Sequence, residues 1–376
     1  MNNIPLSIPN ISGNELAYVA DAIAKQWVST GGSYIARFEE GFSEYAKVPA
    51  ATAVQSGTAA LHLAMIECGI EHGDFVIAPT LTFVAAINPI RYVGADPLFM
   101  GCDDGLCIDP GKLERYICDH CEMRGEALYD KTHSRRVAAL LVVHVFGNMA
   151  DMDRIMDIAE RFGLPVIEDA TEAVGTFYTA GRYAGRMAGT IGDFGAYSFN
   201  GNKIITTGGG GMLVAKDAKK TAHAKYLSTQ AKDDETYFVH NEIGFNYRMT
   251  NLQAALGVAQ LEQLESFIAA KKANYERYND LGLRLLPFSD STRPNYWFYS
   301  FRSRDRDGLV KHLGERGIQA RPVWKLIHTL RMYEQCVAFE IEKAESYHQA
   351  VVNIPCSSNL TGNDVEIVAT AVREFV

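Results

Sequence analysis

The chain has 376 residues, of which 47% are hydrophobic, and a formal net charge of −9 with a pI near 5.6. This length supports a large core and predicts two domains, while the acidic balance disfavours nucleic acid or an anionic membrane as a partner. The longest apolar run, residues 137–146, is too short to span a bilayer, and residues 1–7 lack the features of a signal peptide, so we expect a cytoplasmic protein.

Short apolar runs alternate with helical stretches as far as residue 215. We expect strands at 75–78, 97–100, 138–145, 165–168, 195–199 and 211–215, and helices at 57–67, 110–121 and 151–162. Near-continuous apolar strands between helices predict an α/β fold with a mostly parallel sheet covered on both faces. The polar residues 122–136 are expected to form an excursion at the surface.

A second, smaller unit is predicted after residue 250. Apolar residues at helical spacing predict one long helix from 251 to about 277, connecting to a C-terminal α+β unit. In that unit we expect a strand at 296–301 and helices at 305–316 and 365–375. The expected domains are residues 1–262 and residues 263–376.

Seven cysteines are scattered along the chain, an odd number that does not form a disulfide framework. Cys118 and Cys121 have the spacing of metal ligands, but a zinc site needs a second matched pair, which does not follow. We therefore expect reduced thiols and no metal.

Lys203 is the most informative residue of the sequence. It lies between an apolar, strand-like run and the four consecutive glycines 208–211. Burial at such a position disfavours the ammonium form and lowers the pKa of the amine. A neutral amine forms a Schiff base with a carbonyl, which suits an aldehyde cofactor that carries a phosphate. The alternative is an ordinary loop lysine.

Asp169 follows a short buried strand, and ligands of open α/β sheets bind at the carboxyl ends of the strands. Pyridoxal phosphate needs an acidic partner that keeps its ring nitrogen protonated, and Asp169 is placed for this role. A strand-end aspartate that caps the next helix is the alternative.

A phosphate site is predicted where an extended run changes into a helix at Gly57 and Thr58. Free backbone N–H groups and the positive end of the helix dipole attract anions there, and Ser198 adds a second hydroxyl. The alternative is a simple helix cap. Phe83 ends another strand and would either stack on a cofactor ring or pack in the core. For His144 we favour a core histidine over a substrate contact.

Together these segments resemble a known family. The motifs are 56–61, 168–173, 192–193, 198–203 and 244–251, with 29–31 and 321–328 toward the ends. They resemble the fold type I, pyridoxal-phosphate-dependent sugar aminotransferases of the DegT/StrS type from end to end. The resemblance implies a large sheet domain of the seven-stranded type, followed by a smaller C-terminal α+β domain.

The resemblance also implies residue roles. Lys203 would be the Schiff-base lysine that also moves the proton, Asp169 the partner of the ring nitrogen, and Glu172 a neighbour of the ring hydroxyl. The remaining cofactor contacts would be Gly57, Thr58 and Ser198 at the phosphate and Phe83 on the ring. Asn246 would reach the phosphate in the neighbouring subunit, which implies a homodimer with active sites at its interface.

The same resemblance points to a substrate class. Residues 200–211 and 228–234 look like a branch that aminates nucleotide-linked 4-keto-6-deoxy sugars on routes to bacillosamine and legionaminic acid, although Gly209 stands where the family often has a glutamate. The diphosphate requires cationic groups, with ordinary surface residues as the alternative. Candidate substrate contacts are Ser29, Arg248, Arg321, Lys325 and His328.

The expected reaction transfers the amino group of L-glutamate to the C4 keto group of UDP-2-acetamido-2,6-dideoxy-4-hexulose. The alternatives are a GDP-4-keto-6-deoxymannose 4-aminotransferase of the perosamine type, a 3-keto sugar aminotransferase, a sugar dehydratase, and a non-catalytic regulator that binds pyridoxal phosphate. Lys203 speaks against the dehydratases, which use a histidine there. The nucleotide carrier, the C2 substituent, the orientation of the new amine and the choice between dimer and tetramer stay open.

Overall fold

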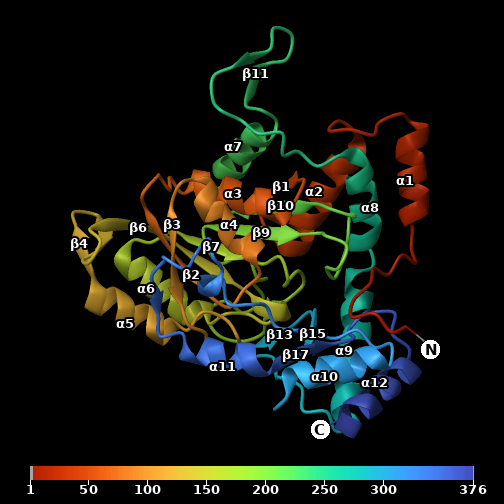
Figure 1. Ribbon diagram of the computed structural model, residues 1–376. Helices are drawn as coiled ribbons and strands as arrows, with labels where there is room; N and C mark the ends of the chain where they lie inside the picture. Colours follow the sequence, from red (N-terminus) through yellow and green to blue (C-terminus); the bar gives the residue numbers. More distant parts are fainter. Residues whose placement is uncertain (1–2, 376) are drawn as a thin grey trace.

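A ten-stranded sheet forms the centre of the protein, which we describe from a computed structural model covering residues 3–375 (Figure 1). Eight strands follow the order β1-β10-β9-β7-β6-β2-β3-β16, and all neighbours from β9 to β16 are parallel. β10 is antiparallel to both of its neighbours, β1 and β9. The predicted α/β fold with a mostly parallel sheet is confirmed. The strands are β1 Ala51–Val54, β2 Phe75–Pro79, β3 Asp96–Met100, β6 Arg135–Val143, β7 Val166–Asp169, β9 Phe194–Ser198, β10 Gly211–Ala215 and β16 Ala338–Phe339.

Both faces of this sheet are covered. Every residue of β1, β2, β7, β9 and β10 is buried, although successive side chains point to opposite faces. Near-continuous apolar strands covered by helices therefore fold as the sequence predicts. The surrounding helices are α1 Glu15–Ala24, α2 Ser33–Ala46, α3 Gly57–Glu67, α4 Val84–Tyr92, α5 Pro110–His120, α6 Met152–Phe162 and α7 Ala218–Ser228.

The polar segment 122–136 is more ordered than expected. It forms the antiparallel hairpin of β4 Cys121–Arg124 and β5 Ala127–Asp130, and β5 extends the large sheet by pairing with β6. Asp130 fixes the following turn, because its carboxylate accepts hydrogen bonds from the Tyr116 hydroxyl and the His133 backbone, both at 2.7 Å.

The long helix predicted from residue 251 is interrupted. It forms α8 Asn251–Leu261 and α9 Leu264–Asp280, with a break at Glu262 and Gln263. Both side chains at the break bind the N-terminal part of the chain: Gln263 donates to Glu15, and Glu262 accepts from Asn14, Tyr18 and Arg37. Contacts with a distant segment thus accompany the end of the helix, where the sequence has neither proline nor glycine.

A smaller unit follows α9 and lies below the large sheet in Figure 1. Its sheet has the order β14-β17-β15, and its expected first strand begins at residue 299 instead of 296. The bounds are β14 Tyr299–Arg302, β15 Arg321–Pro322, β17 Val351–Ile354, α10 Arg306–Glu315, α11 Glu342–Ala350 and α12 Gly362–Phe375.

The two units exchange segments. Ile4 bridges Ile318 in the smaller unit, whereas β16 joins the large sheet beside β3. A division into residues 1–262 and residues 263–376 remains our proposal, and its boundary falls at the break between α8 and α9. Short elements complete the fold: β8 Phe177–Tyr178, β13 Thr292–Arg293 and two 3-10 turns, Val145–Gly147 and Ile327–Thr329.

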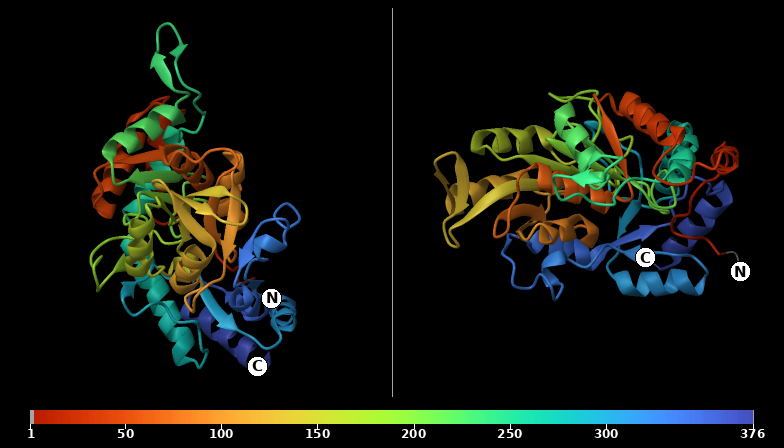
Figure 2. Two further views of the ribbon diagram at one scale, coloured as in Figure 1. Left: turned by 90° about the vertical axis from the view of Figure 1, so that its left-hand side faces the viewer. Right: turned by 90° about the horizontal axis from the view of Figure 1, so that it is seen from above.

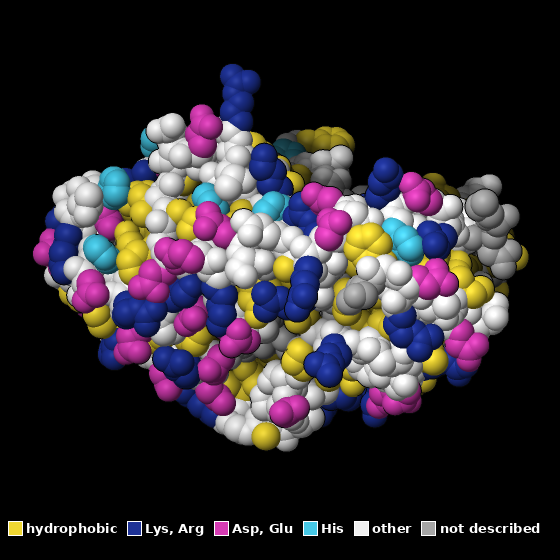
Figure 3. Space-filling model, turned by 60° about the horizontal axis from the view of Figure 1, so that its bottom comes forward, with side chains coloured by type: hydrophobic (Ala, Val, Ile, Leu, Met, Phe, Trp, Pro, Cys, Tyr) yellow, Lys and Arg dark blue, Asp and Glu magenta, His cyan; other side chains and the backbone are white. Residues whose placement is uncertain are grey.

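A hairpin of β11 Lys232–Asp234 and β12 Val239–His240 projects from the body in two perpendicular views (Figures 1 and 2). Its tip and flank expose large apolar side chains: Tyr237 is 80% exposed, Phe238 71% and Ile243 88%. On the face shown in Figure 3, acidic and basic side chains are interspersed. Within residues 3–375, no helix has both the length and the apolar character needed to cross a membrane.

Candidate active site

A cavity of about 490 Å³ opens between the large sheet and the smaller unit. It lies at the carboxyl ends of β7 and β9, the edge at which open α/β sheets bind ligands. Both units contribute to its wall, which brings together residues as distant in the sequence as Leu6 and Asn353. The expected site residues that line it are Gly57, Thr58, Phe83, Asp169, Glu172, Ser198, Lys203 and Arg321.

Lys203 lies in the loop after β9, with its side chain 12% exposed and its Nζ atom 3.8 Å from Glu172 Oε1. Burial lowers the pKa of this amine, and the charges of Glu172 and Asp169 oppose the change. The predicted direction of the shift is confirmed. The site therefore favours the neutral amine more than water does, which is the form that attacks a carbonyl.

Glu172 is buried beside this amine and responds in the opposite direction. Burial raises the pKa of its carboxyl to about 7, against the attraction of Lys203. Its Oε2 atom accepts a hydrogen bond from the Phe146 N–H (2.8 Å). The carboxyl thus exchanges its proton near neutral pH, at one wall of the cavity.

Asp169 ends β7 and is buried, with its Oδ1 accepting from the Thr171 N–H (3.0 Å). Burial raises the pKa of this carboxyl. A cation placed against it would reverse that effect, because an opposite charge at contact distance favours the ionised form. The residue is thus suited to hold a protonated ring nitrogen.

The start of α3 forms one end of the cavity. Ser56 is the helix cap, accepting from the Ala59 N–H (3.0 Å), while Gly57 and Thr58 face the cavity. A Cβ atom at Gly57 would lie 2.9 Å from side-chain carbons of both Ser198 and Thr171, so only glycine allows this close approach. The first turn of the helix therefore meets the Ser198 hydroxyl at an anion-binding position.

These groups fit pyridoxal phosphate. The start of α3, with the hydroxyls of Thr58 and Ser198, suits the phosphate. The Asp169 carboxylate suits the pyridine nitrogen, and the Lys203 amine suits the aldehyde. Phe83 lines the same cavity and is 51% exposed, which is unlike a core residue and leaves its ring open to stacking.

Other expected residues lie outside the lining of the cavity. Arg248 is buried, and its guanidinium pairs with Glu39 and donates to the Ala53 carbonyl (3.1 Å). His328 is 2.7 Å from the Thr80 hydroxyl through Nδ1, and burial lowers its pKa. Ser29, Lys325 and Asn246 are exposed.

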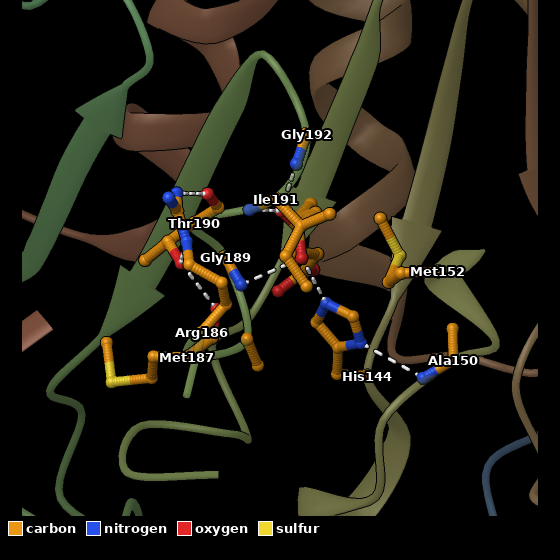
Figure 4. Close-up of polar contacts among 12 residues, drawn as sticks. His144, Ala150, Met152, Arg186, Met187, Gly189, Thr190, Ile191 and Gly192 are labelled. Carbon is orange, nitrogen blue, oxygen red and sulfur yellow. Dashed lines mark hydrogen bonds and ion pairs between the residues drawn. The ribbon is translucent and has the colours of Figure 1, made fainter. Parts of the chain in front are cut away.

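His144 is a satisfied core histidine, as expected, and belongs to a buried network next to the site (Figure 4). Its Nδ1 accepts from the Ala150 N–H (3.2 Å), so Nε2 carries the proton that is donated to Glu168 (2.8 Å). Glu168 also accepts from three backbone N–H groups of the loop before β9. Their donors are Gly189 (2.8 Å), Ile191 (2.6 Å) and Gly192 (2.5 Å).

Several residues of the cavity wall have no signal in the sequence. Trp297 lies in an aromatic run that reads as a strand, and Asn353 comes from β17 of the smaller unit. The proximity of Trp297 and Asn353 to Lys203 follows from packing between units, which local patterns do not encode. Asn200 and Asn202 also line the cavity, but they lie just before Lys203 in the same loop, within the segment 200–211 that carries part of the resemblance in sequence.

Among residues 3–375, no group of three or more His, Cys, Asp or Glu side chains is arranged to hold a metal. Cys118 is exposed on α5, whereas Cys121 is buried at the start of β4, and all seven cysteines are free thiols.

Comparison with known proteins gives a consistent result. A protein described as GDP-perosamine synthase in Caulobacter vibrioides is 36% identical over 387 residues, covering 99% of this chain and 98% of that protein. The GDP-perosamine synthase of Escherichia coli O157:H7 is 35% identical over 385 residues, covering 100% and 99%. The crystal structure of the aminotransferase TlmJ from Streptoalloteichus hindustanus has a TM-score of 0.89 at 27% identity, covering 99% and 98%.

The model of the DegT/DnrJ/EryC1/StrS aminotransferase family matches residues 9–373, almost the whole chain. A solved aminotransferase of this name from Brucella abortus has a TM-score of 0.88 at 27% identity, covering 96% of this chain and 95% of that one. The fold is thus the fold type I of aminotransferases that use pyridoxal phosphate, in agreement with the cavity described above. The chain belongs to the DegT/DnrJ/EryC1/StrS aminotransferase family and is a pyridoxal-phosphate-dependent sugar aminotransferase.

Proposed function

We propose that this enzyme transfers the amino group of L-glutamate to the C4 keto group of a nucleotide-linked 4-keto-6-deoxy sugar. The observation that carries the proposal is the buried Lys203 amine beside Asp169 and Glu172, in a chain of this family. A GDP-linked sugar is favoured, because two relatives that match over nearly their whole length are named GDP-perosamine synthases. The UDP carrier expected from the sequence receives no support from these names.

Bound pyridoxal phosphate would supply the electron sink that lets an amino group pass from donor to ketone. Lys203 would hold the aldehyde end and move the proton between the reacting carbons, because its amine is buried within the cavity and its pKa is lowered. Asp169 would keep the ring nitrogen protonated. Glu172, with a pKa of about 7, would exchange a proton beside the ring hydroxyl.

The nucleotide is expected to enter from the side of the smaller unit. Arg321 on β15 lines the cavity and is exposed, and within residues 3–375 it has no acidic partner within ion-pair distance. A guanidinium in this condition can form two parallel hydrogen bonds with a phosphate. We propose that Arg321 binds the diphosphate, with Lys325 near it in the sequence as an auxiliary cation.

We also propose a homodimer whose active sites lie at the interface. Two observations support it: the apolar side chains exposed on the projecting hairpin, and the position of Asn246, which is exposed outside the cavity of its own chain. A surface patch of this kind favours association with another protein. The seven free thiols support a location in a reducing compartment, the cytoplasm.

The test is a panel of keto sugar nucleotides incubated with the enzyme, pyridoxal phosphate and L-glutamate, with products identified by mass spectrometry and NMR. The expected result is a 4-amino sugar on GDP, formed in a one-to-one ratio with 2-oxoglutarate. Turnover of UDP-linked sugars alone would overturn the GDP carrier in favour of UDP, the carrier expected from the sequence. Bound cofactor without turnover of any sugar would overturn the proposed reaction.

A further inference from the structure

The indole ring of Trp297 covers the amine of Lys203. Its centre lies 4.2 Å from Lys203 Nζ, within the range of a cation–π contact. Trp297 is only 2% exposed, and it reaches the cavity from the segment between β13 and β14, far along the chain from the lysine. An aromatic face stabilises the ammonium form of an amine without accepting a conventional hydrogen bond.

The ring is held in place from both sides. Its Nε1–H donates to the carbonyl oxygen of Asn202 (2.8 Å), the residue directly before Lys203. Its backbone N–H donates to Asn295 Oδ1 (2.9 Å), and the Asn295 side-chain amide donates to the carbonyl oxygens of Glu172 and Val174, both at 2.9 Å. Trp297 therefore connects the lysine loop to the turn that carries Glu172.

The backbone next to the indole is strained. Tyr296 has φ of 55°, in the left-handed region that bulky residues rarely adopt, and its ring packs against Tyr275 and Phe288. Phe146, whose N–H donates to Glu172, has φ of 58°. Such conformations persist where the surrounding structure enforces them, and they concentrate at functional sites.

We propose that Trp297 is a positioning residue for Lys203: its indole face holds the amine whenever no carbonyl is bound to it, and its Nε1–H fixes the lysine loop. The charged groups that act on this amine are Glu172 and Asp169, and Trp297 adds a third, uncharged contact. The inference deepens the proposed function, because it concerns the amine on which amino transfer depends.

The contact can be measured without cofactor or substrate. In cofactor-free protein, trinitrobenzenesulfonate arylates only neutral amines, and mass spectrometry of the peptide that contains Lys203 gives the rate at each pH. Loss of the indole face removes a stabilisation of the ammonium form, so the midpoint of the pH profile falls in Trp297→Leu. Below that midpoint the arylation is expected to be about two- to tenfold faster relative to its plateau at high pH.

Normalising to the plateau removes the effect of easier reagent access. Trp297→Phe keeps an aromatic face, so the midpoint of its pH profile is expected to stay close to that of the wild type. This variant loses the hydrogen bond to Asn202. Trp324→Phe is the matched control, because Trp324 lines the same cavity and makes no cation–π contact with Lys203. Where Trp297→Leu folds poorly, 5-fluorotryptophan can be incorporated in place of tryptophan. Fluorination weakens the attraction of the indole face for the Lys203 ammonium group with little change in shape, so the midpoint of the arylation pH profile is again expected to fall.

In the loaded enzyme, Trp297→Leu is expected to lower kcat, with partial rescue by Trp297→Phe and little change in KM for L-glutamate. An unchanged arylation midpoint in both Trp297→Leu and the fluorinated protein would overturn the inference, even if thermal stability fell. The arylation experiment is independent of the sugar substrate, so a failure of the proposed reaction would leave its result intact.

Discussion

Burial shifts the pKa values of two neighbouring side chains in the cavity wall, Lys203 and Glu172, in opposite directions. The amine becomes less basic and the carboxyl less acidic, because neither charge is well hydrated there. Their attraction across 3.8 Å offsets only part of this effect. Glu172 thus exchanges a proton near neutral pH beside an amine whose pKa is lowered, and perturbed pKa values of this kind concentrate at functional sites.

The raised pKa of Glu172 predicts a dependence of stability on pH. Between pH 4.5, the ordinary value, and about 7 the folded carboxyl binds more protons than the unfolded one, so its contribution to stability is lost as pH rises. Glu172→Gln removes this loss. From pH 5 to pH 8 the variant should therefore gain roughly 1 to 3 kcal/mol of unfolding free energy relative to the wild type.

Thermal unfolding of the cofactor-free proteins at several pH values measures the difference. Glu235→Gln, a change to an exposed carboxylate on the projecting hairpin, is the matched control and should track the wild type. A constant gap between wild type and Glu172→Gln over this range would contradict a pKa near 7.

Asp169→Asn tests the carboxylate at the end of β7. The amide keeps the shape but loses the charge that would hold the ring nitrogen protonated, so kcat should fall about 10- to 1000-fold, the effect of one to three pKa units. Borohydride reduction followed by mass spectrometry should still find the cofactor attached to Lys203. Asp157→Asn, on the surface of α6, is the control. Unchanged kcat would exclude the assigned role.

At the scale of elements, the site depends on the hydrogen bonds that hold the ends of β6, β7 and β9 in position. β6 and β7 run in parallel, and the His144 N–H donates to the Asp169 carbonyl just beyond their paired residues (3.1 Å). Glu168, one residue before Asp169, binds the loop that leads into β9, and β9 leads to Lys203. Burial disfavours the charge of Glu168, but His144 and the backbone amides outweigh it and hold the pKa below its ordinary value. One buried carboxylate thus sets the relative positions of two functional segments.

Glu168→Ala should therefore loosen the loop before β9 and also lower the stability of the fold. Removing the carboxylate leaves three buried N–H groups and His144 without their acceptor, which is expected to cost about 3 to 5 kcal/mol of unfolding free energy. Hydrogen exchange should accelerate at the amides of Gly189, Ile191 and Gly192. Glu160→Gln, on the exposed face of α6, is the control. Preserved protection of these amides would show that the loop does not depend on Glu168.

At the scale of the whole molecule, the cavity is a shared product of two units and, in our proposal, of two subunits. The N-terminal segment packs on the smaller unit and β16 on the larger sheet, so neither unit encloses the site alone. The projecting hairpin presents apolar side chains that the described chain does not bury. A partner of the same sequence would cover them through a symmetric interface.

Subunit mixing tests this arrangement. Lys203→Ala inactivates a site within its own chain, and Asn246→Ala would weaken the site of the neighbour. Co-refolded at equal amounts, the two variants form mixed dimers that contain one intact site, and about a quarter of wild-type activity should return at limiting cofactor. A mixture of Lys203→Ala with Asp169→Asn, both within one site, is the control that should stay inactive. No recovery in the first mixture would place Asn246 outside the active site.

The sequence by itself determined the elements and the residues whose roles are set by local position. Helix α3 and strand β10 have the predicted bounds, and Lys203, Asp169 and Gly57 were identified because each lies at a junction between strand, loop and helix. Local periodicity and turn chemistry are sufficient for such features.

Only the tertiary structure decided the contacts between distant segments. The break between α8 and α9, the pairing of Arg248 with Glu39, the network of His144 and Glu168, and the indole over Lys203 join residues from 24 to about 250 positions apart. Each depends on how side chains meet once the sheet and the smaller unit have packed. The local sequence around any one of these residues is compatible with other partners, so packing selects the partner.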